Sequence, residues 1–197
     1  MSLFVKICGI NDLAAGRAVV EAGADAIGFV FSESPRQVTT RHALSISGEL
    51  PVDVLRVAVF RRPTPEDIDA VLEAFTPDLV QADHDTLDHI TDVATLPVFH
   101  EAGGEAPDGG RFLYEGPVSG AGQLVDLQRA AAVARLGQMV LAGGLRPDNV
   151  GRAVTSVRPF GVDVSSGVET SPGTKDPALI RSFVAAARAA EERLVNA

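Results

Sequence analysis

Short apolar segments alternate with longer stretches of mixed polarity from one end of the sequence to the other. The apolar segments have the length of buried strands, and the stretches between them show the spacing of amphipathic helices. Repeated strand–helix units are typical of a parallel sheet covered by helices. Eight strands are predicted: Leu3–Cys8, Ala26–Phe31, Leu55–Phe60, Leu79–Ala82, Pro97–His100, Arg111–Glu115, Met139–Ala142 and Phe160–Val164.

Helix signals lie between these strands. Asn11 is a candidate N-cap before a helix over residues 12–22. Thr64-Pro65-Glu66-Asp67 combines a cap, a first-turn proline and early carboxylates, and Pro147-Asp148-Asn149-Val150 opens another helix. The last predicted helix places Ile180, Phe183, Val184, Ala187 and Leu194 on one face and Arg181, Arg188 and Glu192 on the other.

Eight strand–helix units in one chain predict a single (β/α)8 barrel domain over residues 1–197. The length of 197 residues is slightly below the usual range of about 200 to more than 400, so one connection must be shortened. Residues 101–110 are rich in glycine and contain a proline, which predicts a loop in place of the fifth helix. An open, doubly wound sheet is the alternative architecture.

Composition narrows the classes of partner. The net charge is -9, from 17 Lys+Arg against 26 Asp+Glu, which argues against nucleic acid or an anionic membrane surface as a partner. A hydrophobic fraction of 46% fits a globular chain that does not span a membrane. The N-terminal segment has neither the basic region nor the apolar length of a signal peptide, so a cytoplasmic location is expected.

The first predicted strand carries two candidate functional residues. Alternation along the strand places Phe4, Lys6 and Cys8 on one face and an all-apolar set on the other, so Lys6 and Cys8 are predicted to point into the barrel. Cys8 is the only cysteine, which excludes an internal disulfide. It is either a small buried hydrophobe or, with a cation nearby to lower its pKa, a base or nucleophile.

The eighth predicted strand adds an inward carboxylate. Asp163 alternates with Val162 and Val164, so it is expected to face the barrel interior. The eighth strand closes against the first, and Asp163 is therefore predicted to pair with Lys6. Such a pair has a purely structural interpretation, as a self-neutralising buried ion pair, and a functional one.

Glycine-bearing turns follow the seventh and eighth strands. They are Gly143-Gly144 and Ser165-Ser166-Gly167. Loops after these two strands are where barrels most often bind phosphate through backbone N–H groups. Each turn alone is weak evidence, because glycine at a turn is usually only conformational, but the two together predict a phosphate site.

Two charged residues stand at other strand ends. Arg36 follows the second strand in a Ser-Pro-Arg loop, where its guanidinium is either solvated or available for a carboxylate. Glu115 ends the sixth strand and is a candidate general acid. The four histidines show no spacing typical of metal ligands, so no metal site is predicted.

Several motifs in a fixed order resemble one enzyme family, the phosphoribosylanthranilate isomerases of tryptophan biosynthesis. The match extends along the whole sequence. The motifs that carry it are Val5–Ile10, Gly23–Asp25, Gly28–Phe31, Ser34–Arg36, Leu141–Leu145, Gly161–Glu169, Pro172-Gly173 and Lys175-Asp176.

The resemblance implies a cofactor-free Amadori rearrangement of N-(5-phosphoribosyl)anthranilate to 1-(2-carboxyphenylamino)-1-deoxyribulose 5-phosphate. It implies that Glu115 protonates the furanose oxygen and that Cys8 removes the proton from sugar C2. Arg36 would hold the anthranilate carboxylate, and Asp163 would lie near the substrate amine and Lys6. The phosphate would bind at the backbone of the two glycine turns, which comprises Gly143, Gly144, Ser165, Ser166 and Gly167.

The sequence departs from the family pattern on its middle strands. Glu115 stands where a Leu-Leu-Asp run normally supplies the acid, and Gly120–Val125 lacks the usual lysine. Ala82-Asp83-His84 replaces the usual Leu-His-Gly. These changes affect the acid step more than the phosphate or carboxylate contacts.

Two other functions remain open from the sequence. A related phosphosugar isomerase, that of histidine synthesis, uses aspartates after strands one and five, where this sequence has Cys8 and His100. A non-catalytic phosphosugar-binding protein would keep the glycine turns without needing an acid. The expected partner is a small phosphoribosyl molecule, and either a monomer or a homodimer is expected.

Overall fold

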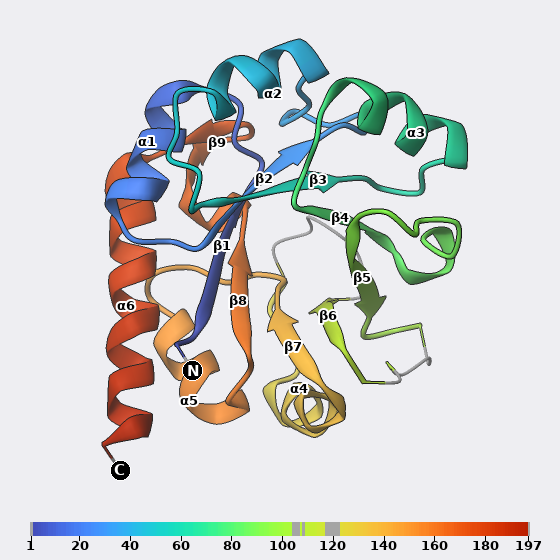
Figure 1. Ribbon diagram of the computed structural model, residues 1–197. Coiled ribbons are helices and arrows are strands. Elements are labelled where there is room, and N and C mark those ends of the chain that lie inside the picture. The colour runs from blue at the N-terminus through green and yellow to red at the C-terminus, as the bar shows by residue number, and fades with distance from the viewer. Residues whose placement is uncertain (1, 104–106, 108, 117–122, 197) are drawn as a thin grey trace.

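Eight parallel strands form a closed barrel in a computed structural model that describes residues 2–103, 107, 109–116 and 123–196 (Figure 1). The strands are hydrogen-bonded in chain order, and β8 closes against β1. The predicted (β/α)8 barrel is confirmed, and the open-sheet alternative is wrong. The strands are β1 Phe4–Cys8, β2 Ala26–Val30, β3 Leu55–Val59, β4 Leu79–Asp83, β5 Ala94–His100, β6 Arg111–Glu115, β7 Gln138–Leu141 and β8 Gly161–Val164.

Helices surround the barrel on the outside (Figure 1). The α-helices are α1 Leu13–Glu21, α2 Thr40–Ser47, α3 Pro65–Ala74, α4 Leu127–Val133, α5 Val150–Val157 and α6 Pro177–Val195. Three short 3-10 turns, η1 His84–Thr86, η2 Ala134–Leu136 and η3 Ser166–Val168, and a hairpin of β9 Glu169–Ser171 with β10 Thr174–Lys175 complete the described elements. In the described part of the chain, no helix is long and apolar enough to cross a membrane.

The helix starts follow local side-chain chemistry. Thr64 caps α3 in a reciprocal capping box with Asp67, as its sequence predicts. The predicted cap of α1 is wrong by one residue, because Asp12 and not Asn11 accepts the N–H of Ala15, at 2.8 Å. Asn11 instead donates from its side chain to the carbonyl of Gly173, at 2.9 Å.

Two neighbouring connections are reduced. Between β4 and β5 the chain forms only η1 and irregular turns, a shortening that the sequence pattern did not predict. The predicted loop between β5 and β6 agrees with residues 101–103, which form a turn; residues 104–106 and 108 lie outside the described residues. Strand β5 begins at Ala94 and not at Pro97, since it pairs with β4 from Leu79 onwards.

The barrel has two separate apolar layers. Alternation in β1 gives Val5 and Ile7 to the layer between sheet and helices, while Phe4 and Cys8 contribute to the barrel interior. The interior cluster of apolar side chains comprises Phe4, Cys8, Ala26, Val57, Val59, Leu79, Leu96, Val98, Leu113, Val140 and Ala142. At the amino end of the strands, the Arg111 guanidinium lies 4.6 Å from the ring centre of Phe160.

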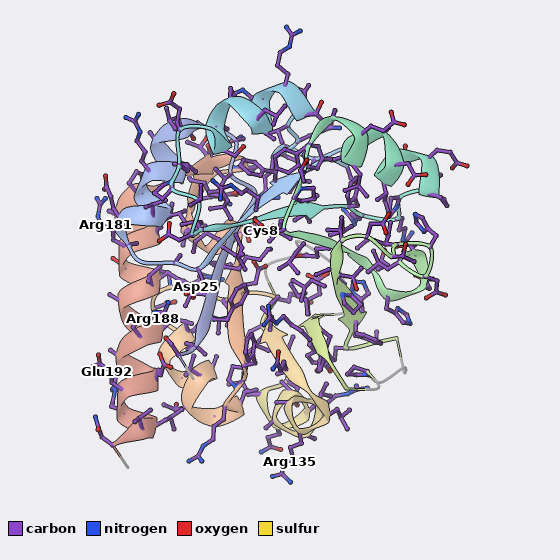
Figure 2. All side chains as sticks on the ribbon, in the orientation of Figure 1. Cys8, Asp25, Arg135, Arg181, Arg188 and Glu192 are labelled. Carbon is purple, nitrogen blue, oxygen red and sulfur yellow. The ribbon has the colours of Figure 1, made fainter. Side chains whose placement is uncertain are left out.

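The last helix holds the first strand in place. Arg188 on α6 donates to Asp25 at 2.9 Å and to the backbone carbonyl of Leu3, and the same Asp25 oxygen accepts the N–H of Val5 at 2.7 Å. Figure 2 shows Arg188 beside Asp25, with Arg181 on the same helix. One arginine therefore joins the two ends of the sequence across the outside of the barrel.

Replacing Arg188 tests this connection. Arg188→Met is expected to lower the free energy of unfolding by about 1–2 kcal/mol, because it removes hydrogen bonds to a carboxylate and to backbone carbonyls that are only partly exposed. Urea denaturation measures the change. Arg181→Met, on the exposed face of the same helix, is the matched control, and equal losses in the two variants would contradict the proposed role of Arg188.

Candidate active site

Strand ends and the loops after them enclose a cavity of about 150 Å³ at the carboxyl end of the barrel. It is lined by residues distant in sequence, including Cys8, Arg36, Glu115 and Asp163. Figure 2 labels Cys8 near the centre of the molecule, at the end of β1 away from the N-terminus. The fold thus gathers the predicted base, acid and arginine around one space, although Lys6 lies below it and is fully buried.

Lys6 and Asp163 form the predicted ion pair inside the barrel. They are direct partners in the register of β1 with β8, and Lys6 Nζ lies 2.7 Å from Asp163 Oδ1. The lysine side chain is 0% exposed. Burial by itself lowers the pKa of Lys6, but the charge of Asp163, helped by the neighbouring thiol of Cys8, outweighs it and raises the pKa overall. The ammonium group therefore stays charged.

The Cys8 thiol lies at the end of β1 and is nearly buried. Glycine at position 28 gives it room, because a Cβ there would lie 3.0 Å from Cys8 Sγ and 3.2 Å from Lys6 Nζ. Burial raises the pKa of Cys8, and the charge of Asp163 adds to this, while Lys6 acts in the opposite direction. The expectation that Lys6 lowers the pKa below the ordinary thiol value is wrong, since desolvation dominates.

Arg36 is already held by a carboxylate that sequence reasoning did not single out. Its Nε and Nη2 donate to the two carboxylate oxygens of Glu169, at 2.7 and 2.8 Å. This bidentate pair leaves Nη1 without a partner among the described residues. Glu169 thus acts as an anchor that orients the guanidinium beside the cavity.

The same carboxylate also binds a buried lysine. Lys175 Nζ donates to Glu169 at 2.7 Å and to the carbonyl oxygen of Ser165 at 3.0 Å. Burial lowers the pKa of Lys175 although Glu169 counteracts it, and hydrogen bonds from Arg36 and Lys175 outweigh burial to lower the pKa of Glu169. Glu169 and Lys175 both lie in motifs of the family resemblance, which was the available signal for them.

The two predicted glycine turns meet in space. Gly143, Gly144, Ser165, Ser166 and Gly167 all line a cavity of about 60 Å³ that Glu115 also lines. The turns approach so closely that a Cβ on Gly167 would lie 1.9 Å from the carbonyl oxygen of Leu145, a steric overlap. Next to it, Gly144, Ser166 and Gly167 also line a larger, open cavity of about 490 Å³.

Glu115 belongs to a group of polar side chains at the ends of three adjacent strands. His100 on β5 lies 2.8 Å from Asp83 of β4, measured from Nε2 to Oδ1, and 3.6 Å from Glu115 of β6, measured from Nδ1 to Oε1. Burial lowers the pKa of His100, but the hydrogen bond to Asp83 and the charge of Glu115 outweigh it, so the pKa is raised. The sequence analysis did not predict the contacts of His100 with Asp83 and Glu115. The signal for them was the alternation along β4 and β5, which places Asp83 and His100 on the inward face of the barrel.

One further polar group faces the cavity. Gln81 is buried and lines the cavity, yet its Oε1 has no hydrogen-bond partner among the described residues. In the same part of the chain, no group of three or more His, Cys, Asp or Glu is arranged to hold a metal ion. The lysine-lacking segment Gly120–Val125 lies partly outside the described residues, since residues 120–122 are not among them.

A closed barrel with a polar rim at the carboxyl ends of its strands defines the (β/α)8 class, in which active sites occupy this rim. The family model of N-(5'-phosphoribosyl)anthranilate (PRA) isomerase matches residues 5–186. An N-(5'-phosphoribosyl)anthranilate isomerase of Chlorobaculum tepidum is 37% identical, over 98% of this chain and 98% of that relative. This chain belongs to the N-(5'-phosphoribosyl)anthranilate isomerase family.

Solved structures agree with this assignment. The phosphoribosyl anthranilate isomerase of Thermus thermophilus has a TM-score of 0.84 at 28% identity, covering 93% of this chain and 98% of its own. Another phosphoribosyl anthranilate isomerase, in complex with reduced 1-(o-carboxyphenylamino)-1-deoxyribulose 5-phosphate, has a TM-score of 0.75 at 33% identity, covering 95% of this chain and 99% of its own.

The buried ion pair predicts an asymmetric response to mutation. Asp163→Asn is expected to destabilise the protein by about 3–5 kcal/mol, because it leaves the Lys6 charge buried without its counter-ion. The double variant Lys6→Met, Asp163→Leu is expected to recover most of this loss, since no charge then remains to be desolvated. Urea denaturation of both variants measures the effect, and a double variant less stable than Asp163→Asn would contradict it.

The thiol pKa can be measured without interference from another cysteine, because Cys8 is the only one. Thiolate absorbance in the ultraviolet is expected to rise at a pH above the ordinary thiol range, since burial disfavours the charged form. Cys8→Ser is the control that removes the signal and leaves that of the single tyrosine. Thiolate formation below about pH 8 would show that Lys6 dominates over burial.

Proposed function

We propose that this chain catalyses the Amadori rearrangement of N-(5'-phosphoribosyl)anthranilate, an isomerisation in tryptophan biosynthesis. The observation that carries the proposal is the convergence of Cys8, Arg36 and Glu115 on one cavity, with the two glycine turns lining the space next to it. Membership of the isomerase family supports the choice of substrate. The reaction is an internal rearrangement, so neither a redox cofactor nor a second substrate is needed.

The proposed acid is Glu115. It donates a proton to the ring oxygen of the ribose as the bond from C1 to that oxygen breaks, and the nitrogen lone pair forms the new C1–N double bond. The carboxyl group lines both the main cavity and the small cavity between the glycine turns. It therefore borders both the proposed phosphate site and the cavity that Cys8 lines.

The proposed base is Cys8. Its thiolate removes the proton from C2, and the electrons of that bond form a C1–C2 double bond while the C1–N double bond becomes single. The resulting enol then becomes the ketone of the product by proton transfer from O2 to C1. Because the pKa of Cys8 is raised, the base form is a minor species at neutral pH, so only a small fraction of the protein carries the ionised thiol that this step requires.

The proposed binding groups are arranged on both sides of the reacting centre. Arg36 binds the anthranilate carboxylate through Nη1, since Glu169 occupies the edge of the guanidinium formed by Nε and Nη2. The backbone of Gly143, Gly144 and the Ser165–Gly167 turn binds the phosphate. Asp163, held by Lys6, lies beside the substrate amine. A few local donors thus suffice for a doubly anionic substrate on a chain with a net charge of -9.

The principal test is turnover. Mixing the purified protein with freshly prepared N-(5'-phosphoribosyl)anthranilate is expected to decrease anthranilate fluorescence. Cys8→Ala and Glu115→Gln are each expected to reduce kcat by about 10²–10⁴-fold, because each removes one proton-transfer group. Arg181→Met, which alters an exposed helix face, is the control and should retain the activity of the unaltered protein.

A second measurement distinguishes catalysis from binding alone. Both active-site variants are expected to bind a product analogue such as the reduced deoxyribulose phosphate, measured by calorimetry, with affinity close to that of the unaltered protein. Binding without any turnover in the unaltered protein would support a non-catalytic phosphosugar-binding barrel instead. The cytoplasmic location and the choice between monomer and homodimer stay predictions.

A further inference from the structure

We propose that Asp83 and His100 are positioning residues that supply the proton delivered by Glu115, so that the acid of this chain is a group of three residues. The inference rests on the proposed function and deepens its acid step. His100 occupies the middle position of the group, 2.8 Å from Asp83 and 3.6 Å from Glu115, and is not among the residues that line the two cavities of the candidate site.

The geometry defines a linear arrangement across three strands. Asp83, His100 and Glu115 end β4, β5 and β6, and His100 and Glu115 are direct partners in the sheet register. Nε2 of His100 lies 2.8 Å from Asp83, and Nδ1 lies 3.6 Å from Glu115. The two ring nitrogens therefore face two different carboxylates. A histidine held in this way bears a proton on each nitrogen when it is charged.

Asp83 is itself held by the backbone. Its Oδ2 accepts the N–H of Arg62 at 3.3 Å, and its carbonyl oxygen accepts the hydroxyl of Thr86 at 2.7 Å. The remaining oxygen, Oδ1, is directed at His100. These contacts determine the orientation of the imidazole ring, which leaves Nδ1 as the nitrogen that faces Glu115.

The charged surroundings of His100 are mainly acidic. On β4 it faces Asp83, on β6 it faces Glu115, and the carbonyl oxygen of Gly116 lies 3.4 Å from Nδ1. The side chain of the following residue, Glu101, accepts the N–H of Asp126, at 3.2 Å. The cations nearby are Arg61, from the loop after β3, and Arg36, which both line the cavity of about 150 Å³. Two adjacent carboxylates favour the protonated imidazole.

The chemistry explains why such a group is useful here. The base form of Cys8 requires a high pH, whereas an isolated carboxyl group has lost its proton well below neutral pH. A proton shared between His100 and Glu115 is retained to a higher pH, because its release belongs to the pair. When Glu115 has donated to the ring oxygen, the Nδ1 proton of His100 passes to the carboxylate, and water reprotonates the imidazole.

The magnitude follows from ordinary pKa values. The ordinary pKa values of histidine and glutamate differ by about two units. When the pair holds the proton, the fraction of protein in which the acid is protonated and the thiol is ionised therefore increases by up to ~10²-fold. A weaker acid transfers its proton less readily, which reduces the gain. We therefore expect His100→Gln to lower kcat/KM at neutral pH by ~10- to 100-fold.

The test is the pH dependence of kcat/KM. Because the thiol titrates at a higher pH than the acid, the limb that rises at low pH reports the acid and the limb that falls at high pH reports Cys8. His100→Gln is expected to move the rising limb toward lower pH and to lower the plateau above it, with KM changed less than kcat, because the pair no longer retains its proton. Asp83→Asn is expected to move the rising limb in the same direction by a smaller amount. His89→Gln, an exposed histidine in the loop after β4, is the matched control and should leave the profile unchanged.

A measurement on the unaltered protein avoids any effect of the substitutions on folding. Nuclear magnetic resonance of labelled histidine is expected to show that His100 titrates above the ordinary histidine range of about 6.5, and that its pKa falls in Glu115→Gln. Titration at or below that value would overturn the inference, as would an unmoved rising limb with an unchanged plateau in a folded His100→Gln protein. If Glu115→Gln retains full turnover, the proposed acid itself is wrong, which is a different failure.

Discussion

The ion pair of Lys6 and Asp163 is the constraint on which the site depends. Two charges 2.7 Å apart occupy the interior of the barrel, where apolar side chains would otherwise complete the packing. Their mutual neutralisation allows the thiol of Cys8 to lie directly above them at the end of β1. The pair also joins β1 to β8, the two strands at which the barrel closes. Closure of the fold and the electrostatics of the base therefore share one contact.

The rest of the rim continues this arrangement of paired charges. Arg36 and Lys175 share the carboxylate of Glu169, and His100 lies between the carboxylates of Asp83 and Glu115. Arg36 and Asp163 are thus each held by a hydrogen bond to another charged side chain, and Glu115 has His100 3.6 Å away. Such support restricts rotamers before any ligand arrives, which reduces the ordering that binding would otherwise require.

Much of the fold could be predicted from the sequence, because alternation of apolar residues reports directly which face of a strand is buried. Alternation along β1 and β8 placed Lys6, Cys8 and Asp163 on the inward face. Because the eighth strand of a closed barrel pairs with the first, this alternation then implied the ion pair of Lys6 with Asp163. The sequence could not reveal that burial outweighs Lys6 at the thiol, since desolvation depends on packing from several strands. The partners of Arg36 and Glu115 were also missed. The sequence places Glu169 in a family motif and His100 at an inward position of β5, but which side chains meet there depends on the tertiary structure. The missing helix after β4 left no sequence signal comparable to the glycines of residues 101–110.

The helices are distributed unevenly around the barrel (Figure 1): the connections after β4 and β5 are reduced, whereas each of the other six strands is followed by an α-helix. The strands that carry Cys8, Asp163 and the glycine turns lie beneath α1, α5 and α6, and α5 and α6 pack closely on each other. Asp83 and His100 end strands whose following connections have no α-helix among the described residues. The base and the phosphate turns therefore lie on the part of the barrel that helices cover, whereas Asp83 and His100, the residues proposed to supply the proton, lie where the described residues provide no α-helix.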